Sequence, residues 1–164
     1  MDPLPAGADA DCGAMIKGFP DLPPIWWAGS MGTIYLAKWF APSWHWQADV
    51  VNIPSKTIFY TGLALIVWSA KWFWQRKTPI EPHNTPQTLI IEGPYRVSRN
   101  PIYLGLVMLT LWSALGHTSL VGLMATVLLW WVLDLRFARK EEKLLVATFG
   151  DAATAYLART RRWI

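Results

Sequence analysis

The chain has 164 residues, of which 53% are hydrophobic and 16% charged, with 12 tryptophans and a formal net charge of +4. This length allows one domain, the single cysteine excludes an internal disulfide, and an ordinary soluble domain would carry roughly 25% charged residues. Because tryptophan is enriched at membrane interfaces and the basic residues gather beside apolar segments, the composition favours a membrane protein and argues against nucleic acid as a partner.

Residues 1–24 are rich in acidic and turn-forming residues, and we expect them to form a mobile N-terminal arm. They lack the basic start and the contiguous apolar core of a secretory signal peptide. Residues 25–164 are then expected to form a single membrane-embedded domain.

Four apolar segments follow the arm, at residues 25–40, 57–74, 102–115 and 119–135. Most are shorter than the ~20 residues of a perpendicular span, so a soluble helical bundle or a re-entrant segment are the alternatives. The tryptophans and the uneven distribution of charge favour about four transmembrane helices in an all-α fold. Residues 116–118 are short enough to join the last two segments as an antiparallel hairpin.

Lysine and arginine are concentrated between the second and third segments and after the fourth. By the positive-inside rule, this pattern places both termini and the connection after the second segment in the cytoplasm, in a bacterial-type inner membrane or its equivalent. Chemistry that needs a cytoplasmic cosubstrate would therefore take place at this face.

The connection at residues 87–105 holds the first informative motif. Gly93-Pro94 predicts a turn, and Asn100-Pro101 predicts a helix start with an N-cap residue followed by proline. Two tyrosines and two arginines gather around this helix start: Tyr95, Arg96, Arg99 and Tyr103. A helix N-terminus beside arginine suits a carboxylate or a phosphate, whereas a plain interfacial loop is the alternative.

Residues 136–150 predict a helix that leaves the membrane and stops at Gly150. Glu141 falls in the apolar stripe that begins at Phe137, so its carboxylate needs a cationic partner. Glu142 lies with the other charges and is placed to pair with Arg139 across one turn.

Residues 151–164 predict a cytoplasmic amphipathic helix at the membrane interface. Its interfacial anchors would be Tyr156, Leu157 and Trp163.

Two motifs follow one another in the second half of the chain. The first is Gly93-Pro-Tyr-Arg followed by Arg99-Asn-Pro-Ile-Tyr-Leu-Gly105, and the second is Glu141-Glu142, then Phe149-Gly150, Tyr156 and Arg162-Trp163-Ile164. In this order they resemble the isoprenylcysteine carboxyl methyltransferase family, whose relatives include the phospholipid N-methyltransferases. The resemblance covers about residues 78–164, and the first half of the chain shows only generic membrane segments.

The resemblance implies a small helical fold, unlike the Rossmann methyltransferases, that binds S-adenosylmethionine on the cytoplasmic side and releases S-adenosylhomocysteine. The methyl acceptor would arrive from the lipid. By the family's motif, the residues that contact the cofactor would be Gln87, Thr88, Leu89, Ile90, Tyr95, Asn100, Pro101, Ile102, Tyr103 and Glu141, with Glu142 as the alternative to Glu141.

Two departures from the family bear on the acceptor. Asn100 stands where many members have histidine, so it cannot act as a base near neutral pH. Phe137 stands where the isoprenylcysteine enzymes carry the arginine assigned to the substrate carboxylate, which argues against a prenylated cysteine. Arg99 and Arg136 are candidates for a clamp on the acceptor, and Asn100 for placing the cofactor.

Methyl transfer from a sulfonium requires alignment of acceptor, methyl and sulfur and exclusion of water, and it requires no metal. The leading hypothesis is therefore a membrane methyltransferase acting on a lipophilic or small-molecule acceptor, with membrane lipids as its surroundings. The alternatives are phosphatidylethanolamine N-methylation and a non-catalytic membrane scaffold.

Overall fold

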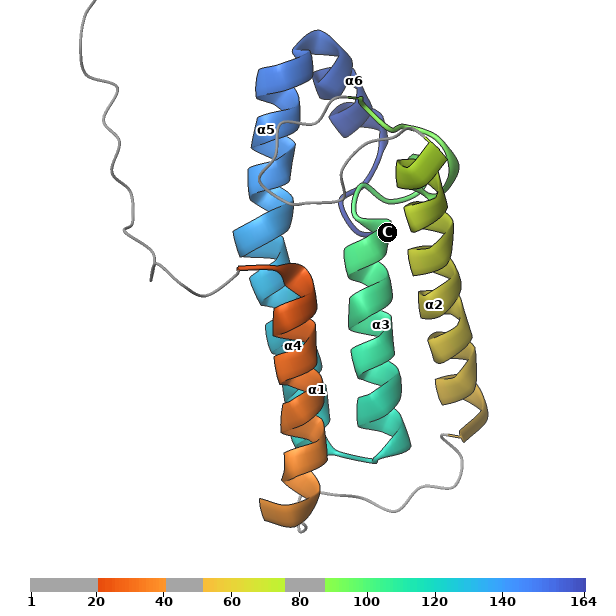
Figure 1. The fold of residues 1–164 in the computed structure, drawn as a ribbon, viewed down its shortest axis with the longest axis vertical. Helices are drawn as coiled ribbons and strands as arrows, with labels where there is room; N and C mark the ends of the chain where they lie inside the picture. The colour runs from red at the N-terminus through yellow and green to blue at the C-terminus, as the bar shows by residue number, and fades with distance from the viewer. Residues whose placement is uncertain (1–20, 41–51, 76–87) are drawn as a thin grey trace, which may run out of the picture.

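Long antiparallel helices form a bundle in the computed structural model, which describes residues 21–40, 52–75 and 88–164 (Figure 1). The bundle helices are α1 (Pro23–Phe40), α2 (Asn52–Gln75), α3 (Pro101–Gly116) and α4 (Leu120–Val132). Helix α3 lies between α2 and the pair formed by α1 and α4. The described part of the chain is thus all-helical, as predicted. The expected mobile arm lies, up to residue 20, outside the described residues, and so does Gln87.

Helix α4 does not end at the bundle. It continues through a π-helical segment, η4 (Leu133–Ala138), into α5 (Arg139–Phe149), which confirms the predicted helix beyond the fourth apolar segment. Gly150 ends α5 with a φ of +53°, a backbone conformation that favours glycine, so the predicted stop is confirmed. Helix α6 (Asp151–Arg159) then turns back across the end of the bundle (Figure 1).

The C-terminal helix differs from the prediction. It ends at Arg159, and the tail Thr160–Ile164 runs back along Ser98 and Arg99. Tyr156 is buried within the protein, and its hydroxyl donates to the Tyr95 carbonyl at 2.8 Å. Its predicted place as a membrane anchor is therefore wrong.

The turn between α3 and α4 confirms the predicted hairpin. The Ser119 side chain accepts a hydrogen bond from the Gly122 amide at 3.2 Å and so caps α4. At the start of α3, Asn100 occupies the N-cap position and Pro101 the first turn, but the Asn100 side chain makes no capping bond. Its amide donates instead to the Arg162 carbonyl at 3.2 Å, so the predicted cap is wrong in its chemistry though right in its place.

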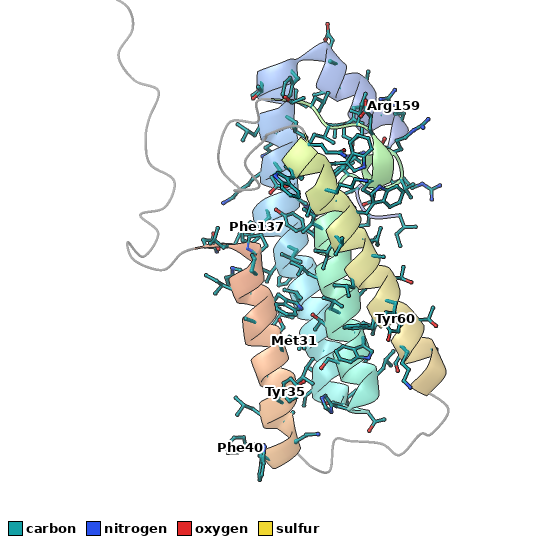
Figure 2. The ribbon with its side chains drawn as sticks, turned by 45° about the vertical axis from the view of Figure 1, so that its right-hand side comes forward. Met31, Tyr35, Phe40, Tyr60, Phe137 and Arg159 are labelled. Carbon is teal, nitrogen blue, oxygen red and sulfur yellow. The ribbon has the colours of Figure 1, made fainter. Side chains whose placement is uncertain are left out.

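Of the described helices, the one spanning Leu120–Phe149 is long and apolar enough to cross a membrane, while α3 is apolar but shorter. A buried core helix of a soluble protein can meet the same criterion, and the four predicted spans are not confirmed by it. Large apolar side chains nevertheless cover the outside of the bundle; Phe40 and Tyr60 project away from it in Figure 2. The other strongly exposed members include Leu36, Trp39, Val67, Trp68, Met124, Val127, Leu128 and Trp131.

Helices α2 and α3 approach closely at two glycines. A Cβ added at Gly105 would lie 2.8 Å from the Gly62 carbonyl oxygen and 2.5 Å from Ile66 Cγ1. A hydrogen at this position lets the two backbones meet, as in membrane helix pairs built on small residues.

We expect Gly105→Ala to destabilise the protein by about 1–3 kcal/mol, because the added methyl forces α2 and α3 apart. The measurement is unfolding in mixed micelles with increasing dodecyl sulfate. Gly116→Ala in the same helix is the matched control, since a Cβ there would meet nothing within 4 Å. Equal stability of the two variants would contradict the close approach.

Candidate functional site

The motif residues converge at one end of the bundle, where the end of α2, the start of α3, α5 and the C-terminal tail meet (Figure 1). The chain enters α3 through a short 3-10 helix, η3 (Gly93–Arg96), which confirms the predicted turn. Gly93 has a φ of +59°, and a Cβ there would collide with the Trp72 indole. Only glycine fits this combination of backbone conformation and close contact.

The tail Thr160–Ile164, which we call the C-terminal clasp, is bonded to the residues just before α3. The Arg99 amide donates to the Arg161 carbonyl at 3.0 Å, and the Ser98 hydroxyl donates to the Arg162 carbonyl at 3.2 Å. Together with the bond from Asn100, these contacts hold the tail against the loop that leads into α3.

Arg99 uses its whole guanidinium within this structure. Its Nε donates to the Thr160 carbonyl at 2.6 Å, and Nη2 to the Leu157 carbonyl at 2.6 Å. Its Nη1 forms an ion pair with Glu142 Oε1 at 2.7 Å. Arg99 therefore joins α5, α6 and the clasp. Its role as an acceptor clamp stays a prediction, and an acceptor would have to compete with these bonds for the guanidinium.

Glu142 is held by two arginines. Arg162 donates from Nε to Oε1 at 2.8 Å and from Nη2 to Oε2 at 2.6 Å, a bidentate pair, while Arg99 bonds the same Oε1. The hydrogen bond with Glu142 raises the pKa of Arg162 above its ordinary value, so this guanidinium stays charged. The expected pairing of Glu142 with Arg139 is wrong, because Arg139 bonds Asp134 instead, from Nε to Oδ2 at 2.7 Å.

Asp134 is the second anion of this network. Trp163 donates to its Oδ1 at 3.0 Å and Arg162 Nη1 to the same oxygen at 3.3 Å, so the clasp reaches both Asp134 and Glu142. Sequence reasoning missed Asp134. The available signal was an ionisable residue inside an otherwise apolar segment, which marks a functional or paired group by default.

Glu141 faces a different neighbour. The Tyr103 hydroxyl donates to Glu141 Oε1, and the Tyr103 ring packs against Phe137 with centroids 6.3 Å apart. Tyr103 and Phe137 are both buried members of the core between α3 and the α4–α5 helix. Within the described residues, Tyr103 is thus a hydrogen-bond donor to Glu141, and the predicted cationic partner stays a prediction.

Two other tyrosines, Tyr95 and Tyr156, are buried at the same end of the bundle. Tyr95 is buried and packs edge-on against Phe73, with ring centroids 5.8 Å apart. Burial raises the pKa of Tyr95, although a hydrogen bond with Ser69 acts in the opposite direction. Burial also raises the pKa of Tyr156 to about 12. Both phenols therefore stay neutral at physiological pH and do not act as bases.

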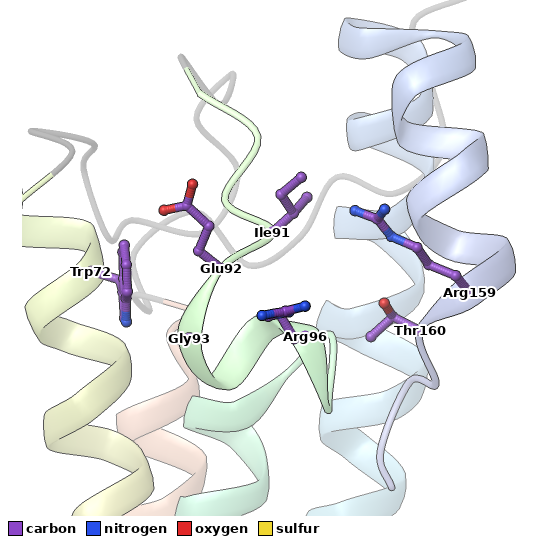
Figure 3. Close-up of a pocket in the computed structure, with 7 residues that line it drawn as sticks. All are labelled: Trp72, Ile91, Glu92, Gly93, Arg96, Arg159 and Thr160. Atoms are coloured by element: carbon purple, nitrogen blue, oxygen red, sulfur yellow. The ribbon is translucent and has the colours of Figure 1, made fainter.

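A pocket of about 690 Å³ opens beside η3. Figure 3 shows Trp72 and Glu92 on one side, Arg159 and Thr160 on the other, and Arg96 between them. This volume lies in the range of about 300–1,000 Å³ that small-molecule sites occupy. The half-buried residues Thr88, Leu89 and Ile90 lead directly into its lining at Ile91.

The predicted site residues fall into several groups. Thr88–Ile90 lead to the pocket, Asn100 and Glu142 bond the clasp, and Pro101 and Ile102 form the first turn of α3. Tyr103 bonds Glu141, and the Tyr95 carbonyl accepts from Tyr156 in α6. Arg136 lies apart from these groups. Its Nε pairs with Asp21 Oδ2 at 2.6 Å and its guanidinium lies 5.6 Å from the centroid of the Trp26 ring, at the start of α1.

The fold and the site together define a helical protein with an apolar bundle and a polar, arginine-rich site at one end. The family model described as phospholipid methyltransferase matches residues 53–152, more than half of the chain. The chain belongs to this phospholipid methyltransferase family, and this membership implies methyltransferase activity and suggests association with a membrane. No curated protein and no solved structure matches the chain.

Proposed function

We propose that this protein is an integral membrane methyltransferase that uses S-adenosylmethionine to methylate a lipid or a small hydrophobic acceptor. Family membership supports the reaction class. The apolar outer surface and the Leu120–Phe149 helix support a place in the membrane. The distribution of lysine and arginine supports a cytoplasmic site with both termini on the same side.

The observation that carries the proposal is that the two adjacent glutamates have different bonding partners. Glu142 is neutralised by Arg99 and Arg162, whereas Glu141 is contacted by the neutral Tyr103 hydroxyl. The family's motif assigns Glu141 to the α-amino group of the cofactor, with which a carboxylate forms a charge-assisted hydrogen bond.

The sulfonium of S-adenosylmethionine supplies an already activated methyl group. The chain's own residues then have to hold the cofactor, align the acceptor and exclude water. Glu141 and Tyr103 would bind the amino-acid end of the cofactor. The residues from Thr88 to Ile90 would contact the remainder of the cofactor and direct it toward the pocket beside η3. Asn100 and Tyr95 would position these elements, since neither is a base at neutral pH.

The test is calorimetric binding to the detergent-solubilised protein. We expect S-adenosylhomocysteine to bind in the micromolar range, near −8 kcal/mol. Methylthioadenosine, which lacks the amino-acid end, should bind at least about tenfold more weakly, because it offers nothing to Glu141. Absence of binding of both ligands to folded protein would overturn the proposal and favour a non-catalytic scaffold.

A phospholipid with a primary amine is the second candidate for the acceptor. Arg96 and Arg159 line the pocket, and neither makes an ion pair within the described residues, so both suit a headgroup phosphate. Transfer of labelled methyl to bilayers that contain phosphatidylethanolamine, with phosphatidylcholine bilayers as the control, tests this acceptor.

A further inference from the structure

We propose that Trp72 and Glu92 recognise the adenine of the cofactor. Trp72 stacks on the base, and Glu92 accepts a hydrogen bond from its 6-amino group. This inference rests on the proposed function, because it concerns the nucleoside end of S-adenosylmethionine. Neither residue is among those that the family's motif assigns to the cofactor.

Trp72 forms one wall of the pocket beside η3. It lies near the C-terminal end of α2, where this helix packs against η3. A Cβ added at Gly93 would lie 2.7 Å from Trp72 Cε2 and 2.8 Å from Trp72 Cδ1, so the pyrrole edge of the indole lies against the Gly93 backbone. Figure 3 shows the ring edge-on beside Gly93, with one face turned toward the interior of the pocket. Contact along the edge of the ring holds it in place and leaves this face to the pocket.

A flat aromatic face of this kind suits a nucleobase. Bases stack on aromatic side chains, and replacing such a side chain with alanine weakens binding by about 10- to 100-fold per base. Adenine is the flat aromatic group of S-adenosylmethionine, whereas its charges lie at the amino-acid end assigned to Glu141. The half-buried Trp72 is therefore suited to the uncharged end of the same ligand.

Glu92 supplies a hydrogen-bond acceptor on the same side of the pocket. It occupies the N-cap position of η3, but its side chain makes no capping bond. Figure 3 shows its carboxylate on the side of Trp72, across the pocket from Arg159. The 6-amino group of adenine donates to a carboxylate, whereas hypoxanthine carries a carbonyl oxygen at the same position, which a carboxylate repels. A pocket with this acceptor therefore selects adenine over hypoxanthine.

The first measurement is calorimetry on detergent-solubilised Trp72→Leu and Trp72→Phe proteins. Leucine keeps an apolar side chain against Gly93 without a flat ring, whereas phenylalanine keeps an aromatic face. We expect Trp72→Leu to weaken the binding of S-adenosylhomocysteine and of methylthioadenosine alike, by about 10- to 100-fold, because both ligands carry adenine. Trp72→Phe should restore most of this loss. Trp74→Leu is the matched control, since Trp74 is 85% exposed and does not line the pocket.

The second measurement compares S-adenosylhomocysteine with S-inosylhomocysteine, which differs from it at position 6 of the base. We expect the wild type to bind the adenine ligand at least about tenfold more tightly, because the carboxylate leaves the inosine carbonyl without a donor. In Glu92→Gln this preference should fall, since an amide can accept from the amino group or donate to the carbonyl. A ratio of two affinities on one protein does not change when a substitution only lowers stability.

The outcomes separate the two proposals. If the folded wild type binds neither S-adenosylhomocysteine nor methylthioadenosine, the proposed function fails and this inference with it. If the wild type binds both but Trp72→Leu binds methylthioadenosine as tightly as Trp74→Leu does, the inference alone is overturned. Equal affinity of the wild type for the adenine and inosine ligands would also overturn it.

Discussion

Glu141→Gln should weaken the binding of S-adenosylhomocysteine by about 10- to 100-fold while leaving the affinity for methylthioadenosine unchanged. Glutamine keeps the size of the side chain and can still accept from Tyr103, but it loses the charge that would bind the ligand's ammonium. A hydrogen bond between charged groups contributes about 1.5–3 kcal/mol, which corresponds to this loss. Calorimetry with both ligands on the same protein preparation is the measurement.

Glu142→Gln is the matched control for this experiment, because it changes the neighbouring residue in the same way. The Glu142 carboxylate forms ion pairs with Arg99 and Arg162. We therefore expect Glu142→Gln to lower the free energy of unfolding and to change the ligand affinity of the folded protein less than Glu141→Gln does. If Glu142→Gln abolished the preference for S-adenosylhomocysteine over methylthioadenosine and Glu141→Gln did not, the assignment of the two carboxylates would be reversed.

Arg99→Ala should destabilise the protein by about 1.5–3 kcal/mol, the range for a hydrogen bond to a charged group, because its ion pair with Glu142 is partly buried. The Arg99 side chain is only 17% exposed, and its loss leaves the carbonyls of Leu157 and Thr160 without their donor. Unfolding in mixed micelles with increasing dodecyl sulfate is the measurement.

Arg96→Ala is the control for Arg99→Ala, because Arg96 is an exposed arginine at the end of η3, three residues before Arg99. We expect its stability to stay within about 0.5 kcal/mol of the wild type, as for most surface substitutions. A stable Arg99→Ala protein that binds cofactor but no longer methylates its acceptor would instead favour the role of acceptor clamp that the motif suggests for Arg99.

Local signals in the sequence predicted most of the secondary structure. The apolar segments became helices, because their length and composition make the helical backbone the way to satisfy amides in an apolar setting. Gly93 and Gly150 mark chain reversals since both adopt positive φ. The two motifs also identified the family, whose model then matched residues 53–152.

The bonding partners of the charged residues could not be predicted from local signals in the sequence. Spacing predicts a pair of Arg139 with Glu142, because they lie one turn apart. In the structure Asp134 binds Arg139, and Glu142 binds arginines 43 and 20 residues away. The tail was predicted as an amphipathic helix from its pattern, whereas its last residues extend along Ser98 and Arg99. Bonds with this sequence separation form only when the fold brings distant elements together.

Composition and motifs were enough to predict an apolar helical bundle with glycine-marked turns and a methyltransferase signature near the C-terminus. They were not enough to predict that Arg99 and Arg162 pair with Glu142 while Tyr103 donates to Glu141. Adjacent residues on a helix differ by about 100° in direction, so the two glutamates meet different elements. Which elements they meet depends on how α5 packs against α3 and the C-terminal clasp, and these parts of the chain are far apart in the sequence.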